Sequence, residues 1–151
     1  GVSTADCVPI LLYFDSPRAV VAIHAGWRGT MKRVAINAVE GLKKSMGLNT
    51  GNCNAVIGPS ISCQAFEVGD EVYEAFRNEG FDMTKTAMRI NGKWHIDLWK
   101  ANAIQLECAG ICADNISIAG ICTYNNHTDF FSARRLGTNS GRIFSGILIR
   151  Q

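Results

Sequence analysis

The chain has 151 residues, of which 47% are apolar and 19% are charged, a composition typical of one globular domain. Its formal net charge of +2 gives no strong field, so neither a nucleic acid nor a membrane surface is expected as a partner. No apolar run approaches the ~18 residues that a membrane-spanning helix needs.

Six cysteines are spread over the sequence without a CxxC pair. A chain of this length, rich in aliphatic residues, does not depend on disulfides for its stability. We therefore expect reduced thiols in a cytoplasmic protein. We also expect a monomer or a small homo-oligomer.

Two strands are predicted near the start of the chain, over residues 8–14 and 18–23, because both runs are β-branched and aliphatic. The turn signal Asp15-Ser16-Pro17 between them makes them paired or neighbouring strands. Cys7 then lies just before the first strand, and His24 lies at the exit of the second.

Cys7 and His24 are suited to two kinds of chemistry. As thiolate and neutral imidazole they are good ligands for zinc or copper. Alternatively, Cys7 is a nucleophile and His24 is the base that activates it. A third interpretation makes Cys7 a packing residue and His24 a structural imidazole. Gly26 and Gly29 favour a site, because glycines let a ligand approach the backbone.

A helix is predicted over residues 31–46 from apolar residues at helical spacing, with Thr30 as a possible N-cap and Gly47 just after its end. Strand, glycine-rich turn and helix in this order resemble a phosphate-binding arrangement, since a helix N-terminus offers free N–H groups. Arg28 would add the cation that a phosphate requires, unless it is an ordinary surface arginine.

Strands and helices alternate through the rest of the chain. The patterns predict strands over 55–57 and 116–121, a helix over 70–80, a hairpin turning at Asn91-Gly92, a helix over 98–109 capped by Asp97, and a closing strand over 142–150. The closing strand is expected to add its aliphatic side chains to the core. Together these elements give a mixed, layered α/β fold in one domain, with five to seven strands and about three helices.

A polar stretch over residues 123–142 contains several arginines. Ser132, Arg134 and Arg135 can hold an anion or a ribose phosphate through forked hydrogen bonds. A solvated basic face is the other interpretation of the same residues. Glu67 is a further charged candidate, which either orients a ligand or lies in a solvated loop.

Four ordered blocks of the sequence resemble the bacterial laccase-domain family, also called polyphenol oxidases or multicopper polyphenol oxidoreductases. The blocks read TADCVPILLYF, VAIHAGWRGT, IGPSISCQAFEVGDEV and CTYNNHTDFFSARRLGTNSGR. The family is described mainly as purine nucleoside phosphorylases that also deaminate adenosine and cleave methylthioadenosine, and some members as copper laccases. Its fold resembles that of deamidating bacterial toxins.

The resemblance implies a zinc-dependent purine nucleoside phosphorylase with adenosine deaminase activity, whose partners are a purine nucleoside and phosphate. Cys7, His24 and Arg28 are the expected catalytic residues. Cys7 and His24 would be two of three ligands to zinc, or alternatively to copper. The third ligand in the family is a His of an upstream Gln-Val-His-Gly-like segment. Residues 1–151 are therefore expected to be a laccase domain without its N-terminal portion.

Phosphate would be held by Arg28 and by the arginine pair Arg134 and Arg135, with Ser132 beside the pair. Three other functions remain open. A copper polyphenol oxidase would need ligands for several coppers, and three His with six scattered Cys supply no such array. A cysteine hydrolase or deamidase would use Cys7 and His24 directly. A non-enzymatic binding domain with an incomplete site is the third.

Overall fold

The centre of the molecule is a four-stranded mixed sheet in the order β3-β2-β4-β8. The computed structural model describes residues 1–150 of the chain. Strand β2 (Val8–Phe14) pairs antiparallel with both β3 (Ala19–Ala25) and β4 (Cys53–Ile57), and β4 pairs parallel with β8 (Ile116–Ile118). The predicted pairing of the first two strands is confirmed.

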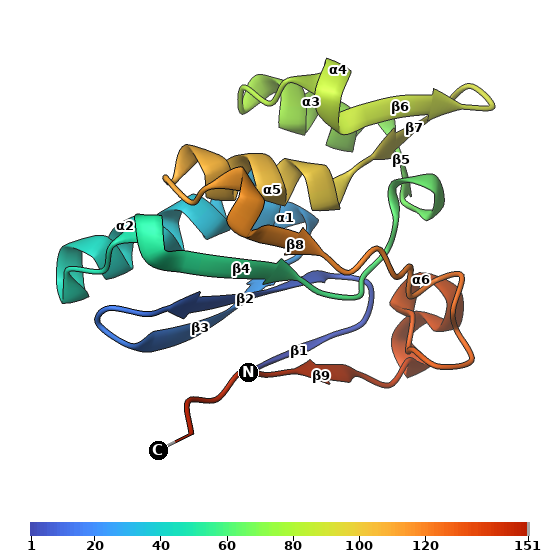
Figure 1. Cartoon of the computed structure of the whole chain (residues 1–151). Helices are drawn as coiled ribbons and strands as arrows, with labels where there is room; N and C mark the ends of the chain where they lie inside the picture. The colour runs from blue at the N-terminus through green and yellow to red at the C-terminus, as the bar shows by residue number, and fades with distance from the viewer. Residues whose placement is uncertain (151) are drawn as a thin grey trace.

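Helices α1 (Trp27–Met31), α2 (Val34–Met46) and α5 (Leu98–Cys108) cover one face of this sheet (Figure 1). Because side chains alternate across a strand, every second residue of β2 points toward these helices. Val8, Ile10, Leu12 and Phe14 are accordingly fully buried. Each such side chain contributes about 1.5–3 kcal/mol to stability, so the core lies between this sheet face and the helices.

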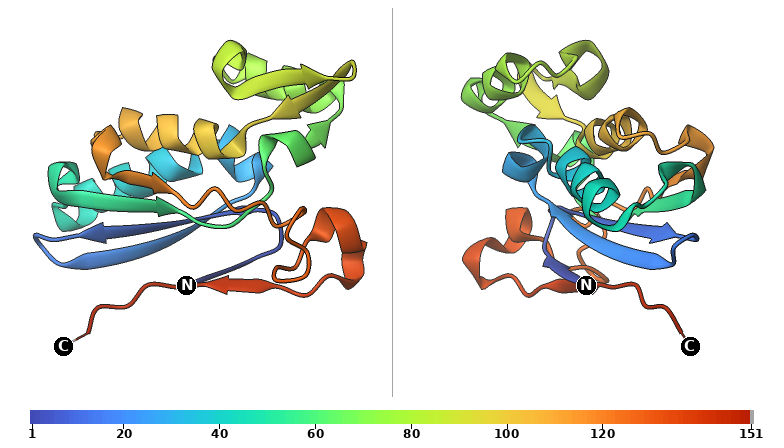
Figure 2. Two further views of the ribbon diagram at one scale, coloured as in Figure 1. Left: turned by 45° about the vertical axis from the view of Figure 1, so that its right-hand side comes forward. Right: turned by 90° about the vertical axis from the view of Figure 1, so that its left-hand side faces the viewer.

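A second, three-stranded sheet of β5 (Glu67–Val68), β7 (Lys93–Ile96) and β6 (Ala87–Ile90) lies with α3 (Asp70–Asn78) and α4 (Met83–Thr86) beyond α5 (Figure 2). Strands β6 and β7 form the predicted hairpin, with Asn91 and Gly92 at φ of +50° and +79° in its turn. The ring of Tyr73 on α3 stacks on Trp94 of β7, with ring centroids 3.8 Å apart. This contact attaches the hairpin to the helix.

Strand β1 (Val2–Thr4) pairs with β9 (Ile143–Ser145) in a separate ladder, on the side of the main sheet away from the helices (Figure 1). A short helix, α6 (Ala133–Leu136), precedes β9. The remaining elements are 3₁₀ turns at Thr50–Asn52, Cys63–Ala65, Ala113–Asn115 and Gly137–Asn139.

The mixed α/β class is confirmed, with α2, α3 and α5 as the three helices of nine residues or more. All six cysteines are free in the structure. Among residues 1–150 no helix is both long and apolar enough to span a membrane.

The helix predicted over 31–46 begins earlier and is broken. Helix α1 starts at Trp27 with Gly26 at its N-cap, and α2 starts after Arg33, whose φ of +60° is left-handed. Thr30 is therefore not an N-cap. It is buried within α1, and its Oγ1 donates to the carbonyl oxygen of Ala25 at 3.3 Å.

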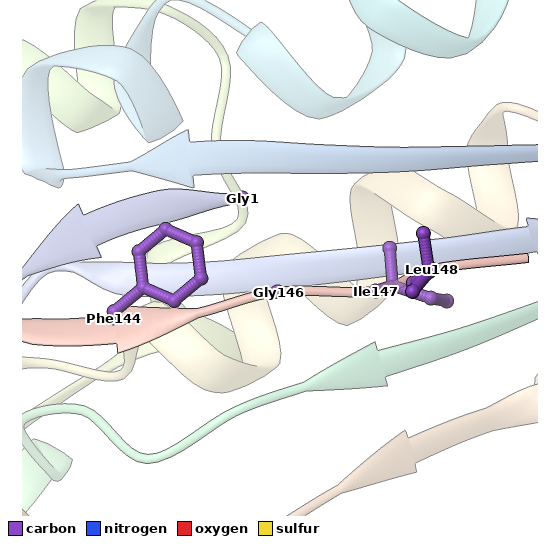
Figure 3. A pocket seen from close by; sticks show the side chains of 5 residues that line it. All are labelled: Gly1, Phe144, Gly146, Ile147 and Leu148. Carbon is purple, nitrogen blue, oxygen red and sulfur yellow. The ribbon is translucent and has the colours of Figure 1, made fainter.

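The prediction of a closing strand over 142–150 that supplies core side chains is wrong. Strand β9 ends at Ser145, and Phe144 and Leu148 are 75% and 80% exposed. Figure 3 shows Phe144 and Leu148, with Gly1, lining an open pocket of about 350 Å³ that contains no titratable side chain. Because β9 pairs with the three-residue strand β1 and not with the main sheet, its side chains lie outside the core.

The strand predicted over 116–121 is shorter and more exposed than expected. Strand β8 stops at Ile118, which is 45% exposed. The reason is its position at the edge of the sheet, where it pairs with β4 on one side only.

Candidate active site

Cys7 and His24 meet at the open end of the β2–β3 hairpin. His24 lies opposite Pro9 in the ladder, and Cys7 immediately precedes β2. A Cβ built on Gly26 would lie 3.0 Å from the Sγ of Cys7 and 3.8 Å from the Nε2 of His24. The thiol and the imidazole thus face one point, which a residue without a side chain leaves open.

The surroundings of Cys7 favour the protonated thiol. Burial raises the pKa of Cys7, the neighbouring Asp6 carboxylate raises it further, and the Arg142 guanidinium lowers it. A cysteine that acts as a free nucleophile normally has a lowered pKa. This environment therefore does not activate Cys7 as a nucleophile, whereas a bound cation would stabilise its thiolate directly.

Asp6 is a site residue that the sequence analysis did not identify. It is 8% exposed, and its carboxylate accepts three hydrogen bonds from the C-terminal part of the chain. Oδ1 accepts from the Oγ1 of Thr123 at 2.7 Å. Oδ2 accepts from the Oγ of Ser132 at 3.0 Å and from the backbone N–H of Arg134 at 2.6 Å. The only signal in the sequence was a carboxylate directly before Cys7.

Three of the predicted anion-binding residues, Ser132, Arg134 and Arg135, lie in and before α6, while Arg28 lies in α1. Ser132 caps this helix, since its Oγ accepts from the backbone N–H of Arg135 at 3.3 Å. The Nη1 of Arg134 donates to the carbonyl oxygen of Glu67 at 2.9 Å. The Nη1 of Arg135 donates to the carbonyl oxygen of Tyr124 at 3.4 Å. Glu67 thus contributes a backbone carbonyl oxygen that binds Arg134, while its side chain is exposed.

Arg28 and Arg134 both lie over aromatic residues beside Cys7. The guanidinium of Arg28 is 4.2 Å from the ring centroid of Trp27, and that of Arg134 is 5.2 Å from the ring centroid of Phe66. Trp27 and Phe66 line a cavity of about 50 Å³, together with Asp6, Cys7, Ile61 and Leu98. One predicted arginine from each half of the chain thus packs on an aromatic ring that lines this cavity, although neither arginine lines the cavity itself.

A zinc ion fits the donor set only in part. Cys7 Sγ and His24 Nε2 form a sulfur–nitrogen pair of the kind that binds zinc. Over residues 1–150, no group of three or more His, Cys, Asp or Glu side chains is arranged to hold a metal. A zinc ion held by Cys7 and His24 would therefore need further donors.

The chain is thus a mixed α/β protein in which Cys7 and His24 face one point at the open end of the β2–β3 hairpin. We call this pair the Cys–His centre. Residues 1–150 match the family model for multi-copper polyphenol oxidoreductase laccases, and the chain belongs to this family.

Curated relatives carry the names of nucleoside enzymes. The chain is 50% identical over 152 residues to a purine nucleoside phosphorylase of Bacteroides thetaiotaomicron, an alignment that covers 99% of this chain and 56% of the relative. It is 50% identical over 150 residues to adenosine deaminase RL5 of an unknown prokaryotic organism, covering 97% of this chain and 56% of the relative. The chain thus spans about half the length of the curated relatives it matches.

Solved structures show the same fold. Hypothetical protein YfiH of Bacillus licheniformis superposes with a TM-score of 0.86 at 32% identity, over 93% of this chain and 53% of that one. YlmD of Geobacillus stearothermophilus superposes with a TM-score of 0.85 at 30% identity, over the same shares of the two chains. Both superpositions support the mixed α/β fold described above.

Proposed function

We propose that this chain carries the Cys–His centre of a zinc-dependent purine nucleoside phosphorylase that also deaminates adenosine. The observation that carries the proposal is the convergence of Cys7 and His24 at Gly26, beside a cavity lined by Trp27 and Phe66, the rings on which Arg28 and Arg134 pack. The names of the relatives supply the reaction class. The six free thiols favour a reducing compartment such as the cytoplasm.

In phosphorolysis, a phosphate oxygen forms a bond to C1′ of the ribose while the bond from C1′ to the purine nitrogen breaks. The products are ribose 1-phosphate and the free purine, which takes up a proton. Arg28 and Arg134 would hold the attacking phosphate and stabilise its charge, because guanidinium groups bind phosphate oxygens through paired hydrogen bonds.

Cys7 and His24 would supply two of the zinc ligands in this proposal. Zinc, when bound, provides a Lewis acid that polarises a hydroxyl group or a water molecule. Gly26 keeps the space between the two donor atoms free. The aromatic rings of Trp27 and Phe66 would exclude water from the cavity, and each ring would hold the guanidinium group of its arginine through a cation–π contact.

The test is steady-state kinetics of the full-length gene product with phosphate as the varied substrate. Arg28→Ala and Arg134→Ala should each raise the KM for phosphate about tenfold or more, since a charge-assisted hydrogen bond contributes about 1.5–3 kcal/mol. Arg77→Ala is the matched control, because Arg77 is an exposed arginine paired with Glu74 on α3. Unchanged phosphate kinetics in both variants would remove the two arginines from the site.

A further inference from the structure

The segment from Ser132 to Arg135, which we call the arginine arm, is attached to the Cys–His centre through one buried carboxylate. Asp6 contacts this arm through Ser132 and Arg134, whose sequence positions are 126 and 128 residues away. We propose that Asp6 is the positioning residue that holds the arginine arm in place to bind phosphate. The phosphate part of this inference rests on the proposed function.

The carboxylate of Asp6 has no cationic partner, so it depends on hydrogen bonds from the arm. The ion pairs among residues 1–150 are Lys43–Glu40, Arg77–Glu74 and Lys85–Asp82. A buried charge without a counter-ion is costly unless hydrogen bonds satisfy it. Three short donors do so here, at 2.6 to 3.0 Å, and two of them belong to the arm. Displacing the arm would leave the carboxylate partly unsatisfied.

The backbone also fixes the direction of the Asp6 side chain. Its φ of +77° lies in the left-handed region, which costs most residues about 1–2 kcal/mol but which Asp and Asn tolerate. Its carbonyl oxygen accepts from the N–H of Ile61 at 3.0 Å, in the loop after β4. The bend between β1 and β2 therefore holds Asp6 from one side while its carboxylate holds the arm from the other.

The residues of the arm that would bind phosphate are held in place by hydrogen bonds that lead to this carboxylate. The backbone N–H of Arg134 donates to Asp6, while its guanidinium reaches the carbonyl oxygen of Glu67. Ser132 donates its hydroxyl proton to Asp6, so its oxygen lone pairs remain free to accept from the N–H of Arg135. Asp6 thereby sets both the orientation of Arg134 and the N-terminal cap of α6.

Asp6→Asn isolates this function with little other change. Asparagine has the same shape and tolerates the same φ, but its amide is neutral and has one acceptor oxygen in place of two, so the hydrogen bonds from Ser132 and from the N–H of Arg134 lose their charge assistance. Asp82→Asn is the matched control. Asp82 caps α4, a helix as short as α6, by accepting from the N–H of Thr84 at 3.1 Å.

The experiment is amide NMR of the 151-residue chain during a titration with inorganic phosphate. In the wild-type chain, phosphate should shift the resonances of Arg134 and Arg135. In Asp6→Asn, the Arg134 amide should lose its protection from hydrogen exchange, and the phosphate affinity should fall about tenfold. Asp82→Asn should leave both unchanged. If Asp6→Asn does not fold, Ser132→Ala removes one of the two bonds between Asp6 and the arm and leaves the other two donors of Asp6 in place, so it should lower the phosphate affinity in the same direction.

An Arg134 amide that stays protected in Asp6→Asn, or a phosphate affinity that stays at the wild-type value, would overturn the inference. Phosphate that shifts no resonance of the arm in the wild-type chain would overturn it equally. Absence of nucleoside turnover by the full-length gene product would contradict the proposed enzyme, while the Arg134 amide would still report whether Asp6 holds the arm.

Discussion

Asn102 on α5 donates a hydrogen bond of 3.0 Å from its Nδ2 to the Oγ1 of Thr30 on α1, and both side chains are fully buried. Gln105, one turn further along α5, donates to the carbonyl oxygen of Thr30 at 2.8 Å. Helix α1 follows Gly26 directly and carries Arg28. The position of α1 on α5 therefore determines where Arg28 stands relative to Cys7 and His24.

We expect Thr30→Val to lower the free energy of unfolding by about 1–3 kcal/mol, because valine leaves the Nδ2 of Asn102 without this acceptor in the core. Urea denaturation measures the change. Thr128→Val, at an exposed loop position, is the control and should stay within about 0.5 kcal/mol of the wild type. Equal changes in the free energy of unfolding for the two substitutions would show that the buried hydrogen bond does not stabilise the fold.

Gly26→Ala should weaken the Cys–His centre without unfolding the chain. Its methyl group would lie 3.0 Å from the Sγ of Cys7 and would occupy the space between the two donor atoms. We expect a clear loss of Co²⁺ affinity, measured by the charge-transfer absorbance of the cobalt–thiolate bond. Gly41→Ala, a helix position with nothing within 4 Å of the added Cβ, should bind Co²⁺ as the wild type does. A cobalt affinity unaffected by Gly26→Ala would mean that metal does not bind between Cys7 and His24.

Phe14→Ala should destabilise the chain by about 3–5 kcal/mol, because it empties a fully buried position on the helix-facing side of β2. Phe144→Ala is the natural comparison, since Phe144 is an equally large side chain that is 75% exposed. It should change the free energy of unfolding by less than about 0.5 kcal/mol. A large loss from Phe144→Ala would contradict the placement of the core between the main sheet and the helices.

The free energy of unfolding should fall as the pH rises from about 9 toward 11. Burial raises the pKa of Cys53 and of Cys63 to about 11 in the folded chain, from 9.0 for a free thiol. Because the folded pKa values are the higher ones, these thiols contribute their full stabilisation below pH 9 and lose it as the unfolded chain ionises first.

Replacing both Cys53 and Cys63 by alanine should flatten this alkaline loss, whatever the variant's stability at neutral pH. The control replaces the exposed Cys108 and Cys112 and should keep the wild-type slope. Urea denaturation at several pH values gives the slopes. Identical slopes for the two double variants would show that Cys53 and Cys63 do not ionise differently in the folded chain.

Much of the fold could be predicted from local patterns. Continuous β-branched and aliphatic runs identified β2 and β3, and the Asn91-Gly92 turn identified the β6–β7 hairpin. Asp97 caps α5 as predicted, accepting from the N–H of Lys100 at 2.9 Å. Each of these features depends on residues close together in the sequence, which is why sequence reasoning reached them.

The errors came from long-range packing. Thr30 has the side chain of an N-cap, but its burial against Asn102 places it inside a helix. Residues 142–150 are aliphatic enough for a core strand, yet β9 pairs with β1 outside the core. Asp6 was missed as a site residue because its partners Thr123, Ser132 and Arg134 are more than a hundred residues away, where no local pattern connects them.

We propose that Cys7 is part of the Cys–His centre of a purine nucleoside phosphorylase. The most direct test of this proposal is chromatographic analysis of the products formed from adenosine and phosphate by the full-length gene product and by its Cys7→Ala variant. We expect adenine and ribose 1-phosphate only when phosphate is present, with inosine from deamination, and the loss of these products in Cys7→Ala. No turnover of adenosine, inosine or methylthioadenosine by the metal-bound wild-type protein would contradict this proposal.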